Sequence, residues 1–143
     1  MKTLLVLIGL PGSGKSTYAK EWVKEDPENR VRYNNDDFRT MILKTWENKP
    51  NQVVIESKIA LLKAWMRMGL DIVVDNTNLM PYEIESYKVL VRDFPEYEVV
   101  LKIIDTPLEI CKERNQTRDS HMDNSFLDQA QKLLNEIKKE YDI

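Results

Sequence analysis

Short apolar runs alternate with segments of helical periodicity along most of the chain. Runs rich in Val, Ile and Leu predict buried strands at residues 2–8, 71–75 and 97–105, and a short strand is expected at 30–33, so that four strands are expected in all. Apolar residues at helical spacing, bounded by capping residues, prolines or glycine, predict helices at 15–24, 38–46, 53–68, 81–94, 107–118 and 125–141.

This order of elements predicts an α/β fold. Strands that alternate with helices form a parallel sheet, here of about four strands, with helices on both faces. The 143 residues contain no internal repeat, low-complexity tract or Gly/Ser linker, so a single domain over residues 1–143 is expected. Ligands bind at the carboxyl ends of the strands in such sheets, and the residues that follow each strand are therefore the candidates for function.

The segment after the first strand carries the most specific signal. It reads GLPGSGKS, which fits the phosphate-binding pattern G-x-x-x-x-G-K-S between a strand and a helix. Glycines let successive N–H groups converge on phosphate oxygens at the positive end of the helix. Lys15 is expected to reach the β- and γ-phosphates of ATP, and the Ser16 hydroxyl to bind Mg²⁺. The expected nucleotide-binding residues are Gly9, Pro11, Gly12, Ser13, Gly14, Lys15, Ser16 and Thr17.

Two aspartates, Asp36 and Asp37, follow the second strand. Neighbouring side chains do not easily face one pocket, so one carboxylate is expected in the crevice and the other at the helix start. Beside a triphosphate site, the crevice carboxylate is suited to accept a proton from a substrate hydroxyl, whereas helix capping by both residues is the alternative. Arg39 shares a helical face with Asp36 and would either hold an anionic group of the acceptor or remain a solvated surface residue.

Polar residues also follow the third strand. Asp75 ends an apolar run, as does the acidic residue that assists Mg²⁺ in many triphosphate-hydrolysing folds, usually through water. The alternative is an ordinary turn, because Asp and Asn both favour turns. The side chains of Thr77 and Asn78 are suited to bind a substrate sugar or phosphate, and the turn interpretation is equally open for them.

Arg114 and Arg118 lie four residues apart in the predicted helix after strand four. Two like charges on one helix face are unfavourable unless an anion lies between them, and a solvated surface pair is the alternative. In a phosphate-loop fold this pair suggests a helical lid. One arginine would stack on adenine, and the other would neutralise charge on the transferred phosphoryl group.

Composition limits the other possibilities. A net charge of −3 and a sequence pI of about 5.3 exclude a large basic surface that coats nucleic acid, although they allow a pocket for one or two phosphates. With one cysteine, Cys111, and one histidine, His121, neither an internal disulfide nor a zinc site is expected. The reduced thiol and the expected use of ATP favour the cytoplasm. No signal peptide or apolar stretch of membrane-spanning length is apparent. The oligomeric state stays open.

The segments GLPGSGKST, NNDDFR, VVDNTNLMP and RNQTR together resemble the kinase domain of the phage polynucleotide kinase family, in order and over nearly the whole chain. The resemblance implies ATP-dependent transfer of a phosphoryl group to the 5′-hydroxyl end of DNA or RNA. It implies that Asp36 is the general base and that Arg39 binds the phosphate on the 3′ side of the terminal nucleotide. It further implies that Arg118 is the lid arginine facing the phosphoryl group, with Arg114 as its neighbour.

The chain departs from the family pattern at two positions. Asn35 stands where members often carry arginine, and the acidic position of the D-T-N segment aligns with Asn76, one residue after Asp75. The family's usual phosphatase partner is also absent from these 143 residues, so kinase activity alone is expected. Two other functions stay open: a small-molecule kinase acting on a nucleoside, sugar acid or antibiotic, and a nucleotide-dependent switch protein without an acceptor.

Overall fold

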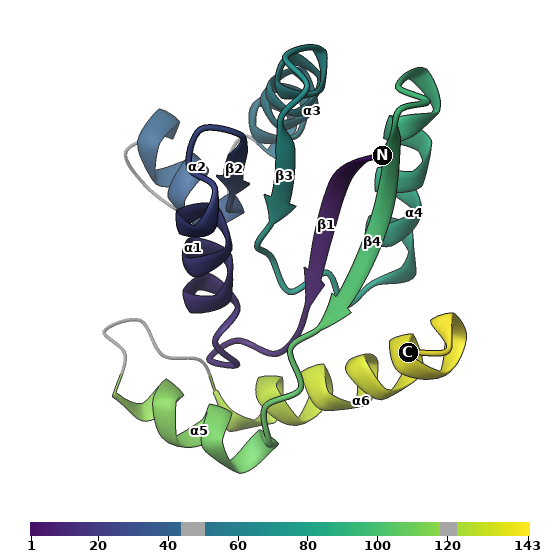
Figure 1. The fold of residues 1–143 in the computed structure, drawn as a ribbon. Helices are drawn as coiled ribbons and strands as arrows, with labels where there is room; N and C mark the ends of the chain where they lie inside the picture. The colour runs from purple at the N-terminus through teal and green to yellow at the C-terminus, as the bar shows by residue number, and fades with distance from the viewer. Residues whose placement is uncertain (44–50, 118–122) are drawn as a thin grey trace.

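A four-stranded parallel sheet forms the centre of the molecule (Figure 1). The structure is a computed structural model that describes residues 1–43, 51–117 and 123–143. Its strands are β1 (Lys2–Ile8), β2 (Arg30–Tyr33), β3 (Asp71–Val74) and β4 (Tyr97–Ile103). Its helices are α1 (Lys15–Glu25), α2 (Asn35–Leu43), α3 (Asn51–Arg67), α4 (Pro81–Leu90), α5 (Leu108–Gln116) and α6 (Asn124–Tyr141), with a 3₁₀ turn at Val91–Asp93.

The strand order β2-β3-β1-β4 places the phosphate-binding loop beside the ends of its neighbours. β1 pairs with β3 through Leu4–Ile72 and with β4 through Leu4–Val99. The side chains from Leu4 to Ile8 are buried because β1 is central and helices cover both of its faces. The parallel α/β architecture predicted from the sequence is thus confirmed.

The two faces of the sheet have cores of unequal size. On one face, Leu5, Leu7 and Val73 pack against α1 through Ala19 and Trp22. On the other face, the larger core joins alternate strand residues to four helices. Its helical members are Leu62 and Met66 from α3, Ile84 and Tyr87 from α4, Cys111 from α5, and Ala130, Leu134 and Ile137 from α6. The helices therefore fix the strand ends from both sides, which makes a rigid frame for the loops.

Several element boundaries differ from the predicted ones. Helix α2 begins at Asn35, three residues early, because the Asn34 side chain accepts a hydrogen bond of 2.9 Å from the Asp37 N–H and so caps the helix. Helix α4 ends at Leu90 and continues as a 3₁₀ turn. The predicted end of the second helix, at residues 44–46, and residue 118 of the fifth lie outside the described residues.

Helices α5 and α6 run past the edge of the sheet where the strands end, next to the phosphate-binding loop (Figure 1). The Asp123 side chain caps α6 by accepting a 2.9 Å hydrogen bond from the Ser125 N–H. Over the described residues, none of the helices combines the length and the apolar character needed to cross a membrane.

Candidate active site

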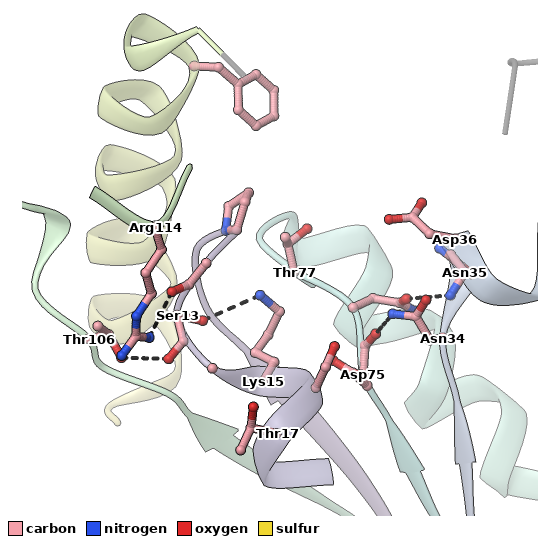
Figure 2. A pocket seen from close by; sticks show the side chains of 16 residues that line it. Ser13, Lys15, Thr17, Asn34, Asn35, Asp36, Asp75, Thr77, Thr106 and Arg114 are labelled. Atoms are coloured by element: carbon pink, nitrogen blue, oxygen red, sulfur yellow. Dashed lines mark hydrogen bonds between the residues drawn. The ribbon is translucent and has the colours of Figure 1, made fainter. Parts of the chain in front are cut away.

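A cavity of about 710 Å³ lies at the carboxyl end of the sheet. The loops after all four strands and the two helices at this edge contribute to it. The lining residues are Pro11 to Thr17, Asn34, Asn35, Asp36, Asp75, Asn76, Thr77, Thr106, Arg114 and Phe126. The segments expected to converge from their positions after the strands therefore do converge, as Figure 2 shows.

The phosphate-binding loop requires glycine at three of its positions. Gly12 and Gly14 have φ values of 80° and 97°, which residues with a Cβ rarely adopt. A Cβ on Gly9 would lie 2.9 Å from the backbone oxygen of Ile104 and 2.8 Å from Ser13 Oγ. The loop thus wraps tightly around its own side chains and leads into α1, whose positive end faces the cavity.

Lys15 is held inside the curve of this loop. Its Nζ donates a hydrogen bond of 2.7 Å to the carbonyl oxygen of Leu10 and a longer one of 3.4 Å to Ser13 Oγ. The side chain is buried yet lines the cavity (Figure 2). A cation fixed in this way is placed to receive an anionic ligand without a large rearrangement.

The loop is also anchored from outside. Thr106 donates a hydrogen bond of 2.6 Å from its hydroxyl to the carbonyl oxygen of Ser13. Arg114, on α5, donates from Nη1 to the carbonyl oxygen of Gly12 at 3.0 Å. The Arg114 guanidinium therefore lies directly against the phosphate-binding loop. Arg118, the other predicted lid arginine, lies outside the described residues.

Asparagines at the end of β2 position the first turn of α2. Asn34 donates a hydrogen bond of 2.6 Å to the carbonyl oxygen of Asp75, and the Asn35 N–H donates one of 2.8 Å to Asn76 Oδ1. These bonds tie the end of β2 to the end of β3. In this frame the Asp36 side chain lies in the cavity lining, across from the loop that carries Lys15 (Figure 2).

The second aspartate has a different environment. Asp37 Oδ2 forms an ion pair of 2.9 Å with Arg32, and Asp37 is not part of the cavity lining among the described residues. The sequence argument that only one of the two carboxylates faces the crevice therefore agrees with the geometry. Arg39, which follows on α2, also lies outside that lining, and its contact with an acceptor stays a prediction.

Asp75 lies at the floor of the cavity and is almost completely buried. Its Oδ2 accepts hydrogen bonds from Arg32, at 2.8 Å from Nε and 2.7 Å from Nη2. Its other oxygen, Oδ1, has no hydrogen-bond partner in the described part of the chain. A buried carboxylate oxygen without a partner is costly, so this atom is suited to bind a ligand or its water.

These features test whether the residues fit Mg²⁺. Ser16 lines the same cavity with an exposed side chain, and the unpartnered Asp75 oxygen supplies the hard oxygen donor that Mg²⁺ prefers. Over the described residues there is no cluster of three or more His, Cys, Asp or Glu side chains that would hold a metal without a ligand. The donor set fits an ion that shares its coordination with phosphates and water.

Thr77 and Asn78, the two substrate-binding candidates that follow Asn76, have different environments. Thr77 lines the cavity, as expected of a substrate-binding residue. Asn78 is fully buried with φ of 48°, and its amide donates a hydrogen bond of 2.7 Å to the carbonyl oxygen of Leu7. This geometry favours the turn interpretation for Asn78, whose side chain links β1 to the β3 loop. Its predicted contact with substrate has no support from its position.

Several residues of the site carried no recognised signal in the sequence, among them Asn34, Thr106, Arg32 and Phe126. Arg32 carried no motif signal, because its role depends on a contact with Asp75, 43 residues away. Phe126 begins the apolar face of the amphipathic helix α6, yet its side chain is 52% exposed and lines the cavity. The sequence feature that could have indicated a role for Phe126 is its place in the first turn of α6, the helix that follows the two predicted lid arginines.

The fold and loop define a nucleotide-binding domain of the P-loop class. The sequence profile of a family described as AAA domain matches residues 4–141, so the chain belongs to that family. A protein of Autographa californica nuclear polyhedrosis virus, named as a bifunctional polynucleotide kinase/RNA ligase, is 32% identical over 128 residues. A protein of Acanthamoeba polyphaga mimivirus, named as a bifunctional polynucleotide phosphatase/kinase, is 31% identical over 117 residues.

These relatives are much longer than the present chain. Each match covers 82% of this chain, but only 18% of the first relative and 24% of the second. A chain in the structure of the Pnkp1/Rnl/Hen1 RNA repair complex superposes with a TM-score of 0.72 at 29% identity, over 97% of this chain and 46% of that one. The resemblance to polynucleotide kinases inferred from the sequence is confirmed by these three comparisons.

Proposed function

We propose that this domain transfers the γ-phosphoryl group of ATP to the 5′-hydroxyl end of DNA or RNA. The observation that carries the proposal is the placement of Asp36 in the same cavity as Lys15, on the opposite wall (Figure 2). Phosphoryl transfer to a hydroxyl acceptor needs a carboxylate at this place to accept the hydroxyl proton, whereas a simple nucleotide switch does not need one. The names of the relatives support a polynucleotide as the acceptor.

The donor side of the cavity is built to hold triphosphate. The N–H groups of the loop and the positive end of α1 bind phosphate oxygens, and Lys15 binds the β- and γ-phosphates. Ser16 and, through water, Asp75 are the residues that would hold Mg²⁺, which supplies neutralising charge on those phosphates. The adenine would lie between Arg114 and Phe126, both of which line the cavity beyond the loop.

The acceptor side supplies the base. Asp36 accepts the proton of the 5′-hydroxyl as its oxygen attacks the γ-phosphorus, and the bond from that phosphorus to the β–γ bridging oxygen breaks to release ADP. Arg39 binds the phosphate on the 3′ side of the terminal nucleotide. Arg118 neutralises the charge of the transferred group. The acceptor needs only this local pocket, so an acidic protein with a net charge of −3 is compatible with a nucleic-acid substrate.

The direct test incubates the protein with Mg²⁺, ATP labelled at the γ-phosphate and three acceptors: a 5′-hydroxyl oligonucleotide, a nucleoside and a sugar acid. Label is expected on the oligonucleotide only. Asp36→Ala is expected to abolish transfer while ATP binding persists, and Lys15→Ala to weaken both. Label on a nucleoside or sugar acid alone would instead assign a small-molecule kinase. Slow ATP hydrolysis with no labelled acceptor, unchanged by Asp36→Ala, would assign a switch protein.

A further inference from the structure

Arg32 joins three of the elements that surround the cavity. From β2, its Nε and Nη2 donate to Asp75 Oδ2 at 2.8 and 2.7 Å, and its Nη1 donates to Asp37 Oδ2 at 2.9 Å. Nη2 also lies 3.4 Å from Ser16 Oγ. One guanidinium therefore contacts the end of β3, the first turn of α2 and the start of α1. The planar fork of arginine suits this task, because its N–H groups point in fixed and different directions.

The contact with Asp75 determines which carboxylate oxygen is available. Asp75 is 1% exposed, and burying a carboxylate is costly unless a positive charge and hydrogen bonds pair it, as Arg32 does here. Arg32 donates to Oδ2 of Asp75, and Oδ1 of Asp75 is left without a hydrogen-bond partner at the floor of the cavity. The Asp75 side chain is thus fixed with Oδ2 bound to Arg32 and Oδ1 available to a ligand. Removal of a group that orients a metal ligand in this way commonly lowers the affinity of the site for the metal.

The contact with Asp37 fixes the other wall of the cavity. Asp37 belongs to the first turn of α2, directly after Asp36, and its ion pair with Arg32 draws that turn towards β2. The Asp37 N–H is bonded to Asn34 at the same time, so both its backbone and its side chain are constrained. Rotation of this turn would carry the Asp36 carboxylate away from the cavity. The Asp37–Arg32 pair opposes that rotation.

We propose that Arg32 is a positioning residue that couples the metal-side carboxylate, Asp75, to the acceptor-side carboxylate, Asp36, through Asp37. The proposal rests on the proposed kinase function for its catalytic half. The metal-side half concerns Asp75, with the longer contact to Ser16 Oγ beside it, and does not depend on the acceptor. Loss of Arg32 then weakens metal binding and turnover together. It leaves metal-free nucleotide binding largely intact, because the contact of Arg32 with the loop that is described above is the long one to the Ser16 hydroxyl.

The test compares Arg32→Gln and Arg32→Lys with Arg30→Gln in the whole chain. Arg30 is the matched control: it lies on the same strand two residues earlier, and it pairs with Glu25 and stacks on Trp22, away from the cavity. Three quantities are measured: Mn²⁺ binding in the presence of ATP by electron paramagnetic resonance, binding of a fluorescent ATP analogue in EDTA, and kcat with a 5′-hydroxyl oligonucleotide. Circular dichroism and thermal melting establish that each variant folds.

For Arg32→Gln, Mn²⁺ affinity and kcat are each expected to fall about tenfold or more, with binding of the ATP analogue in EDTA within about twofold of the native protein. Arg32→Lys is expected to recover the metal affinity in part and kcat less, because one ammonium cannot bond both carboxylates. Arg30→Gln is expected to change none of the three. If Arg32→Gln is unfolded, Arg32→Lys carries the test, since it keeps a positive charge beside the buried Asp75, and native metal affinity and native kcat in that variant would overturn the proposal.

Native metal affinity and turnover in a folded Arg32→Gln variant would overturn the proposal. So would tighter Mn²⁺ binding, which would show that the guanidinium competes with the metal instead of orienting its ligand. A native protein that labels no acceptor would overturn the proposed kinase function alone, because the Mn²⁺ measurement still decides the role of Arg32 towards Asp75.

Discussion

Asp36 and Asp37 are neighbours in the chain but have different partners: Asp36 lines the cavity, and Asp37 forms a 2.9 Å ion pair with Arg32. This division follows from the start of α2, where Asn34 caps the helix by accepting the Asp37 N–H. With Asp37 held by both its backbone and its side chain, Asp36 is left as the carboxylate of this turn that can meet an acceptor. The pair therefore offers an internal comparison between a proposed base and a structural residue.

Asp36→Asn is expected to lower kcat for phosphoryl transfer at least about 100-fold, because an amide cannot take the hydroxyl proton. ATP affinity is expected to stay within about twofold, since Asp36 lies on the acceptor wall. Steady-state kinetics with a 5′-hydroxyl oligonucleotide and equilibrium binding of an ATP analogue give the two quantities.

Asp37→Asn is the matched control for that measurement. It keeps the size of the side chain and removes the ion pair with Arg32, so a loss of less than about tenfold in kcat is expected. Equal losses in the two variants would show that Asp36 acts on structure alone, and near-native turnover in Asp36→Asn would remove it as the base.

Phe126→Ala is expected to raise KM for ATP about 5- to 100-fold and to leave kcat within about threefold. Stacking of a base on an aromatic ring contributes on the order of 1–3 kcal/mol, and Phe126 is an exposed aromatic in the cavity lining. Tyr82→Ala is the control, because Tyr82 is 70% exposed on α4 and lies outside that lining. A KM that is equally changed in both variants, or in neither, would remove Phe126 from the nucleotide site.

Gly9→Ala is expected to destabilise the fold by roughly 1–3 kcal/mol, as overpacking does in tightly built regions. The added Cβ would lie 2.9 Å from the Ile104 backbone oxygen, and β1 and β4 cannot separate there without loss of pairing. Gly69→Ala supplies the comparison: its φ of +74° carries strain, but the new Cβ would meet only Lys2 Cε at 4.0 Å. Urea unfolding measures both, and a larger loss for Gly69→Ala would contradict the packing argument.

The fold and the triphosphate site could be predicted because their signals are local. Five consecutive apolar residues are enough to predict that β1 is buried. The loop after it needs glycine because its backbone takes positive φ angles. The same locality placed Asp36 and Asp75 at strand ends, and a parallel sheet brings strand ends together.

What could not be predicted depends on contacts between distant segments. Arg32 sits in a short strand with no motif, and its importance comes from Asp75 in another strand. Asn78 has a polar side chain of the kind that binds substrates. In the structure its φ is 48°, and the side chain lies in the interior, where it donates a hydrogen bond to the carbonyl oxygen of Leu7. Phe126 obeys helical periodicity, and only the position of α6 beside the cavity shows that its ring faces outward.

Lys58 provides a pH-dependent test of the packing behind the site. On α3, its Nζ donates a hydrogen bond of 2.6 Å to Tyr87 Oη and lies 4.7 Å from the centre of that ring and 5.3 Å from that of Tyr33. Burial lowers the pKa of Lys58 to about 8, against the opposing effect of Glu83. In the unfolded chain a lysine has a pKa of about 10.4.

Between pH 8 and 10 the unfolded chain therefore keeps a proton that the folded protein has released. Because the unfolded state then binds more protons, the free energy of unfolding rises with pH, by at most about 1.4 kcal/mol per pH unit. Lys58→Met removes this contribution, so the stability of the native protein is expected to increase relative to Lys58→Met from pH 8 to 10. The buried tyrosines, including Tyr33 with its pKa raised to about 12, release protons above this window and are present in both proteins.

Urea unfolding at pH 7, 8, 9 and 10 measures the difference, with Lys20→Met on α1 as a control for loss of an exposed lysine. The control is expected to show a constant difference from the native protein across the series. A constant difference for Lys58→Met as well, or one that moves in the other direction, would mean that the Lys58 ammonium is solvated and does not pack between α3, β2 and α4.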